Sequence, residues 1–149
     1  MNLTIQFLLL LLINNTILYC TMKQNPKSAI SVILLFHSHR AILTFLTSMF
    51  LTSIIEELFF SMYLSQFLDR HILSLVFGIY HLPMLYVNYE NIKNNFILAC
   101  FNKLALTSMG GYFLFSVYFE HSIYWSIIIH TLYNILLLLS TYVIAKCIL

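Results

Sequence analysis

The sequence predicts an all-α membrane protein, a polytopic transmembrane helix bundle with about five spans plus one interfacial helix. Composition is the first observation, because 61% of the 149 residues are hydrophobic and only 8% are charged. A soluble domain carries about 25% charged residues, which this chain lacks. The second observation is that the apolar residues form several runs of near-transmembrane length, as expected where side chains face lipid. We therefore expect an integral, multi-pass protein of the cell membrane.

The apolar runs define the expected elements. A span needs about 20 mostly apolar residues, and five runs approach that length: 3–20, 41–64, 72–88, 96–118 and 123–145. The run at 29–36 is too short to cross, so it predicts an interfacial helix. The first run has no basic residue before it and no clear cleavage site after it, so we interpret it as an uncleaved span. The chain then divides into an N-terminal span and interfacial segment, 1–40, and a main membrane domain, 41–149.

Charge and cysteine content exclude several classes of function. The formal net charge is +2 and the basic residues fall singly, so no nucleic-acid partner is expected. The three cysteines, Cys20, Cys100 and Cys147, are scattered and form no CxxC pair. Neither a zinc knuckle nor a disulfide framework is indicated. The partners indicated by composition alone are membrane lipids.

Polar side chains inside the predicted spans are the strongest functional signal. An ionisable residue at the centre of a span costs about 2.5–3.5 kcal/mol, so several retained together are expected to face the interior of the bundle. Within the spans the sequence places Glu56, Glu57, His81, Lys103 and His130, with Asn134 as a polar companion.

Three of these residues are expected at one depth in the membrane. Glu57 lies seven residues before the end of its span, His130 seven residues after the start of its span, and His81 about nine. Because the spans alternate in direction, all three side chains should lie about 10–14 Å below the same surface. His130 and Asn134 are four residues apart and share a helix face. Pro83 should kink the helix beside His81.

These side chains have a chemistry in common. A carboxylate beside a neutral imidazole can hold and deprotonate a water molecule. A second imidazole and an amide can donate hydrogen bonds to a developing oxyanion. Together they suffice to hydrolyse a peptide bond without a covalent intermediate.

Three motifs resemble a known family. They are EELFF at 56–60, FGIYH at 77–81 and HTLYN at 130–134. The set is similar to the CPBP family, which contains type II CAAX prenyl endopeptidases and proteins of bacteriocin processing or immunity. The family pattern is a double glutamate followed by arginine, then FxxxH, then HxxxN or HxxxD. The resemblance covers about residues 41–140, so 41–149 would form a CPBP-like intramembrane protease domain.

The resemblance implies an intramembrane endopeptidase that cleaves a peptide or prenylated-protein substrate. By this resemblance, Glu56 and His81 would activate the water, His130 and Asn134 would form the oxyanion site, and Glu57 would support the first glutamate. No cofactor is expected. The family was once described as metal-dependent, and zinc is the alternative, with Glu56, His81 and His130 as ligands.

One departure from the family pattern bears on activity. The family arginine is Ser61 here, which leaves Glu57 without its expected cation. We expect Glu57 to be neutral, or paired with a residue such as Arg70 folding back from its loop. Lys103 is expected nearer the opposite surface, too far to substitute. Two alternatives stay open: a catalytically silent family member acting in bacteriocin immunity or as a membrane scaffold, and a small ion or proton carrier.

Overall fold

The computed structural model describes residues 3–24, 26–88 and 96–149, and its regular elements within these ranges are all helical. The described residues form six α-helices, with a π-helix and a 3₁₀-helix between α3 and α4 and a further 3₁₀-helix after α4. In chain order the elements are α1 (Leu3–Gln24), α2 (Pro26–His37), α3 (His39–Glu56), the π-helix η1 (Glu57–Tyr63), the 3₁₀-helix η2 (Leu64–Gln66), α4 (Arg70–Tyr80), the 3₁₀-helix η3 (Leu82–Asn88), α6 (Phe96–Glu120) and α7 (Ile123–Ile148).

Four helical stretches in the described residues are long and apolar enough to cross a membrane. They are Leu3–Gln24, His39–Gln66, Phe96–Glu120 and Ile123–Ile148. These stretches agree with the predicted spans at 3–20, 41–64, 96–118 and 123–145. A shorter apolar helix, α2, stands where the sequence predicts an interfacial helix. The all-α class is therefore confirmed, and the four candidate spans are consistent with an integral multi-pass membrane protein.

The fifth expected span, at 72–88, is not a single long helix. Its α-helical part, α4, has 11 residues and ends at Tyr80. Such a helix rises about 16 Å, roughly half the hydrocarbon core of a bilayer. At its end the amide of His81 bonds the carbonyl of Gly78 at 3.2 Å, and a 3₁₀-helix follows. Pro83 lies in this second helix and has no N–H with which to continue an α-helix. The described chain thus has four long apolar helices rather than five.

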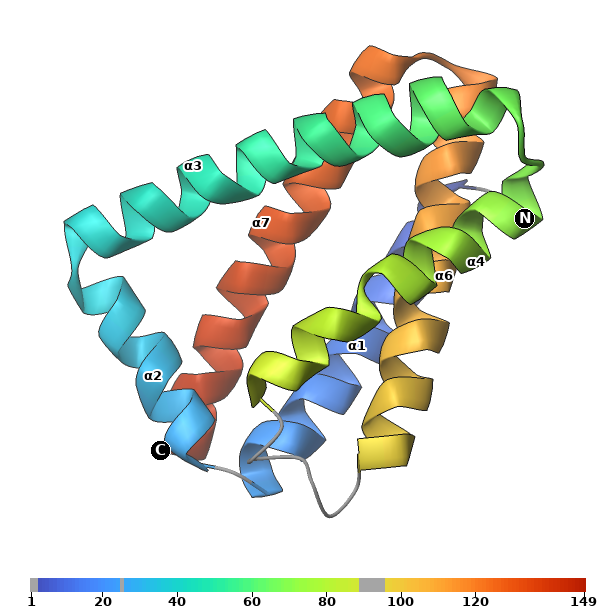
Figure 1. The fold of residues 1–149 in the computed structure, drawn as a ribbon. Coiled ribbons are helices and arrows are strands. Elements are labelled where there is room, and N and C mark those ends of the chain that lie inside the picture. Colours follow the sequence, from blue (N-terminus) through green and yellow to red (C-terminus); the bar gives the residue numbers. More distant parts are fainter. Residues whose placement is uncertain (1–2, 25, 89–95) are drawn as a thin grey trace.

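Helix α7 is the centre of the bundle (Figure 1). It packs against α1, α2, α3, α6 and the π-helix η1, whereas α4 packs chiefly against α6. Two polar contacts join it to α1: the Asn14 amide donates to the Tyr133 hydroxyl, and the Ser140 hydroxyl donates to Asn15 Oδ1 at 2.7 Å. In an apolar bundle such contacts help to set which faces of the two helices meet.

Two glycines allow α4 to lie close to α6. A Cβ atom at Gly78 would come within 2.1 Å of Ser108 Oγ and 3.0 Å of the Leu104 carbonyl oxygen. A Cβ atom at Gly111 would lie 2.9 Å from a ring carbon of Phe77. Small residues at such seams let helix backbones approach in membranes. The seam sets the position of α4, which carries Phe77 and ends beside His81.

We predict that Gly78→Ala destabilises the bundle by about 1–3 kcal/mol, because the added methyl group meets α6 backbone and must push α4 away. The measurement is thermal unfolding of the detergent-purified protein followed by circular dichroism. Gly110→Ala is the matched control, since its Cβ would lie 3.8 Å from the nearest heavy atom, on Leu10. Equal stability of the two variants would contradict this account of the seam.

Candidate active site

The two adjacent glutamates lie where the α-helix changes to a π-helix. Glu56 is the last residue of α3 and Glu57 the first of η1. At the far end of η1 the amide of Leu64 bonds the carbonyl of Phe59, five residues earlier. In a regular α-helix adjacent side chains diverge by about 100°, yet here both carboxylates contact the same histidine. Such π-helical turns are rare and frequently occur at functional sites.

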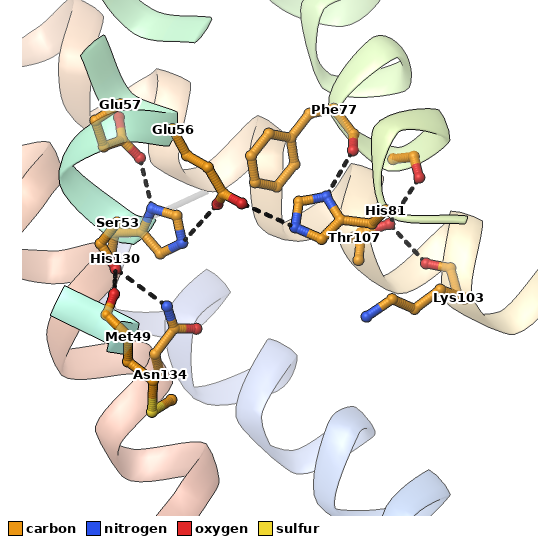
Figure 2. A network of polar contacts seen from close by, with 11 residues as sticks. Met49, Ser53, Glu56, Glu57, Phe77, His81, Lys103, Thr107, His130 and Asn134 are labelled. Atoms are coloured by element: carbon orange, nitrogen blue, oxygen red, sulfur yellow. Dashed lines mark hydrogen bonds and ion pairs between the residues drawn. The ribbon is translucent and has the colours of Figure 1, made fainter. Parts of the chain in front are cut away.

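Glu56 lies between the imidazoles of two histidines from different helices (Figure 2). Its Oε1 atom is 3.5 Å from His81 Nε2 at the end of α4, and its Oε2 atom is 3.6 Å from His130 Nε2 on α7. Glu56 is 7% exposed and His130 5% exposed. The layer predicted from residue counts along the spans is therefore present, and it brings three of the predicted site residues into contact.

The orientation of His81 is set by its own helix. Its Nδ1 atom lies 2.8 Å from the carbonyl oxygen of Phe77. A carbonyl can only accept, so Nδ1 carries the proton and Nε2 faces Glu56. The Phe77 ring packs 4.4 Å from the His81 ring and 6.3 Å from that of His130, measured between centroids. Phe77 thus supports both histidines, and Gly111 leaves the space for its ring.

Glu57 is almost completely buried, at 1% exposure, and its carboxylate has three partners. Its Oε1 atom lies 2.9 Å from His130 Nδ1, and its Oε2 atom accepts from the hydroxyls of Ser61 and Ser126, each at 2.6 Å. The expected pairing with Arg70 is wrong. Arg70 instead donates to Ser116 Oγ and stacks over Tyr112, because helix α6 lies beside the start of α4. Two hydroxyls and an imidazole thus satisfy the Glu57 carboxylate in a chain that has Ser61 at the position of the family arginine.

Asn134 lies one turn after His130 on α7, as predicted, but their contacts differ. The Asn134 amide donates to Ser53 Oγ at 3.2 Å, and that hydroxyl donates to the Met49 carbonyl at 2.9 Å. His130 instead joins the two glutamates. Asn134 also lines an open, largely apolar groove of about 380 Å³ between α2, α3 and α7. Through this open groove, the Asn134 amide is reached from the apolar outer side of the bundle.

Lys103 lies in the same layer as His81, so its expected place near the opposite surface is wrong. Thr107, one turn later on α6, bonds the Lys103 carbonyl at 2.7 Å and lies 3.4 Å from the Gly78 carbonyl. Helices α4 and α6 run antiparallel (Figure 1). Going back one turn along α6, from Thr107 to Lys103, therefore leads to the same level as going forward along α4 from Gly78 to His81. The Lys103 side chain is directed from α6 toward the other site residues (Figure 2), and its ammonium attracts the Glu56 carboxylate.

A metal would need three ligands held together. Among residues 3–24, 26–88 and 96–149, no three His, Cys, Asp or Glu side chains are placed to hold one ion. His130 Nδ1 is engaged by Glu57, and the two Nε2 atoms each face a different oxygen of Glu56. The alternative zinc set of Glu56, His81 and His130 therefore does not fit this arrangement, and no step below passes through a metal.

Residues 38–136 match the family model described as type II CAAX prenyl endopeptidase Rce1-like. The chain belongs to this family. The matched segment begins at the N-cap of α3 and ends within α7, so it contains every residue of the layer described above. The family is one of CAAX-type prenyl endopeptidases. Comparisons with curated proteins and with solved structures give no match.

The sequence did not indicate two residues of this candidate site. Ser126 contacts Glu57 and Ser53 contacts Asn134, but a serine in an apolar helix is common and carries little signal. Ser126 lies four residues before His130, on the same helix face. This four-residue spacing is the sequence feature that indicates Ser126 could contact the same glutamate as His130.

We predict that Ser61→Ala and Ser126→Ala are coupled, because both hydroxyls donate to the same oxygen of Glu57. Each single change leaves one donor and should cost about 0.5–1.5 kcal/mol, whereas the double variant leaves a buried acceptor unsatisfied and should exceed the sum. Thermal unfolding of the four proteins measures the coupling. Ser74→Ala combined with Ser61→Ala is the control pair, because Ser74 bonds the His71 carbonyl elsewhere on α4. Additive costs for Ser61 and Ser126 would show that they do not share this oxygen.

Proposed function

We propose that the protein hydrolyses a peptide bond of a membrane-anchored substrate with a water activated by Glu56 and His81. The observation that carries the proposal is the placement of the Glu56 carboxylate between the Nε2 atoms of His81 and His130. A carboxylate buried in a span and left without a function is costly. Here it is flanked by groups that can hold water, orient it and exchange its proton.

Water activation follows from the tautomer of His81. With the Nδ1 proton donated to the Phe77 carbonyl, neutral His81 presents an Nε2 lone pair beside Glu56 Oε1. One water can donate its two hydrogens to these two acceptors, which leaves an oxygen lone pair free for attack. As that oxygen bonds to the substrate carbonyl carbon, Glu56 takes one proton. Glu56 then returns the proton to the departing nitrogen, so no covalent intermediate forms.

The negative charge that develops on the carbonyl oxygen needs donors. His130, held at Nδ1 by the Glu57 carboxylate, can carry a second proton on Nε2 and donate it to the oxyanion. Asn134 uses one amide hydrogen for Ser53 and carries another for the same purpose. In this mechanism Glu57 acts as an anion that supports His130, with the Ser61 and Ser126 hydroxyls completing its hydrogen bonds.

The substrate class follows from the family and the position of the site. Rce1-like endopeptidases act on prenylated CAAX proteins, and a prenylated or otherwise lipid-anchored peptide would be held at the membrane where this site lies. The apolar groove beside Asn134 is where we place the apolar part of such a substrate. Its lining, from α2, α3 and α7, includes Leu35, Phe45 and Leu138.

The hypothesis of a catalytically silent family member rests on Ser61, which stands at the position of the family arginine. The contacts of Glu57 with His130, Ser61 and Ser126 weaken this hypothesis, because the carboxylate is satisfied without an arginine. An ion carrier gives no reason for both histidines to present Nε2 to one carboxylate. The endopeptidase proposal accounts for this arrangement directly.

We predict that Glu56→Gln lowers cleavage of a membrane-tethered prenylated CAAX peptide by at least about a thousandfold, since the amide cannot accept the proton of the water. The matched control is Glu120→Gln at the exposed end of α6, which should cleave like wild type. Turnover is measured in reconstituted vesicles by release of a fluorescent product. If the wild type cleaves no such peptide while folded, the silent-member alternative replaces this proposal.

We also predict that cleavage persists after extensive treatment with a metal chelator, because the proposed proton transfers use only protein groups and water. The assay compares turnover before treatment, after chelation and after addition of zinc. Activity that disappears with the chelator and returns with zinc would overturn the mechanism and point to direct ligation of the metal by rearranged histidines.

A further inference from the structure

Lys103 is a cation in the middle of a membrane-spanning helix that the reaction proposed above does not use. It lies in α6, partly buried, at the level of His81. Its side chain is directed toward the other residues of the layer (Figure 2). Within the described parts of the chain, its ammonium makes no ion pair at contact distance; the ion pairs of this layer join the histidines to the glutamates.

An ammonium group in this position is stable only with an anion nearby. Charged residues in membrane spans are expensive and, when retained, face cavities, partners or ligands. Glu56 attracts Lys103 electrostatically, yet both oxygens of Glu56 already face histidine nitrogens. Among residues 3–24, 26–88 and 96–149, the cation therefore has a long-range counter-charge but no hydrogen-bonded partner. It remains able to bind a second carboxylate.

We propose that Lys103 binds the terminal carboxylate of the substrate and so selects peptides that end close to the bond to be cleaved. The inference deepens the proposed function and rests on it. A free carboxylate inside the membrane needs a cation, because an unpaired charge there is strongly disfavoured. Lys103 would supply this charge at the depth where Glu56 and His81 act on the peptide bond.

The spacing of the helices limits the length of the released fragment. Neighbouring packed helices are about 8–10 Å apart, and the close α4–α6 seam at Gly78 lies at the lower end of such distances. An extended peptide covers about 3.3 Å per residue. A carboxylate on Lys103 would therefore lie about one to three residues beyond the bond held at Glu56 and His81. Lys103 thus acts on specificity, with no part in the proton transfers.

The competing role for Lys103 is that of a counter-ion to Glu56 alone. In that case removing it should slow catalysis for every substrate, through kcat. Binding of a terminal carboxylate instead affects only substrates that have one, and mainly through KM. A pair of peptides that differ only at the C-terminus separates the two roles.

The experiment compares one prenylated CAAX peptide with its C-terminal amide, in vesicles, using wild type, Lys103→Met and Lys103→Arg. Wild type should favour the acid by at least about tenfold in kcat/KM. Lys103→Met should lose this preference through a raised KM for the acid, so that acid and amide reach the same kcat/KM, and Lys103→Arg should keep part of the preference. Lys146→Met is the control, since Lys146 lies at the end of α7 over Tyr142. Equal use of acid and amide by wild type, or equal loss on both in Lys103→Met, would overturn the inference.

A binding measurement keeps the inference testable apart from catalysis. The affinities of the same two peptides are measured by fluorescence anisotropy with Glu56→Gln protein in nanodiscs, with and without Lys103→Met. Tighter binding of the acid that is lost in Lys103→Met supports carboxylate recognition, even if wild type cleaves nothing and the proposed hydrolysis fails. Equal affinity for acid and amide in the protein that retains Lys103 counts against recognition whether or not hydrolysis occurs.

Discussion

The contact of His130 with both glutamates is the interaction on which the rest of the site depends. Two carboxylates on adjacent residues, buried inside a membrane protein, repel each other and have lost their hydration. His130 lies between them, with Nδ1 at 2.9 Å from Glu57 and Nε2 at 3.6 Å from Glu56. The single imidazole of His130 thereby stabilises both buried carboxylates. Because His130 is on α7, the helix that contacts most of the bundle, this arrangement is tied to the packing of the whole fold.

The two histidines are oriented in the same way, by a hydrogen bond at Nδ1, but the partner differs. The Phe77 carbonyl accepts from Nδ1 of His81, and Glu57 Oε1 lies 2.9 Å from Nδ1 of His130. Each contact turns Nε2 toward one oxygen of Glu56. The difference lies in the charge of the acceptor: a neutral carbonyl suits a histidine that accepts from water, and a carboxylate suits one that must carry an extra proton. The proposed division of roles between the histidines follows from these partners.

The sequence contains enough information for the layer but not for its details. The long apolar runs at 3–20, 41–64, 96–118 and 123–145 predict the long helices because a membrane demands both length and apolarity. Counting residues from the ends of the runs predicts one depth for Glu57, His81 and His130; in the structure His130 contacts Glu57, and His81 contacts the neighbouring Glu56. The depth expected for Lys103 was wrong, since Thr107, one turn after it, lies at the Gly78 carbonyl.

The sequence also carries no signal that predicts the π-helix. No Gly or Pro marks residues 57–63, and the long-range contacts of Glu57 at the start of the π-helix, with Ser126 and His130 on α7, form only in the folded bundle. The partner of Glu57 could not be read from composition either. Ser61 is visible as a departure from the family pattern, but the compensating hydroxyl comes from residue 126, which is far along the chain.

The hydrogen bonds of Glu57 explain why a serine can replace the family arginine. The Ser61 hydroxyl, four residues after Glu57, donates to Glu57 Oε2 from the position where the family has its cation. Ser126 on α7 donates to the same oxygen, and His130 Nδ1 lies 2.9 Å from the other. Both oxygens of this buried carboxylate therefore have partners without an arginine. In the proposed mechanism Glu57 supports His130 through these contacts, and Lys103 on α6, which takes no part in that mechanism, remains available for the substrate carboxylate.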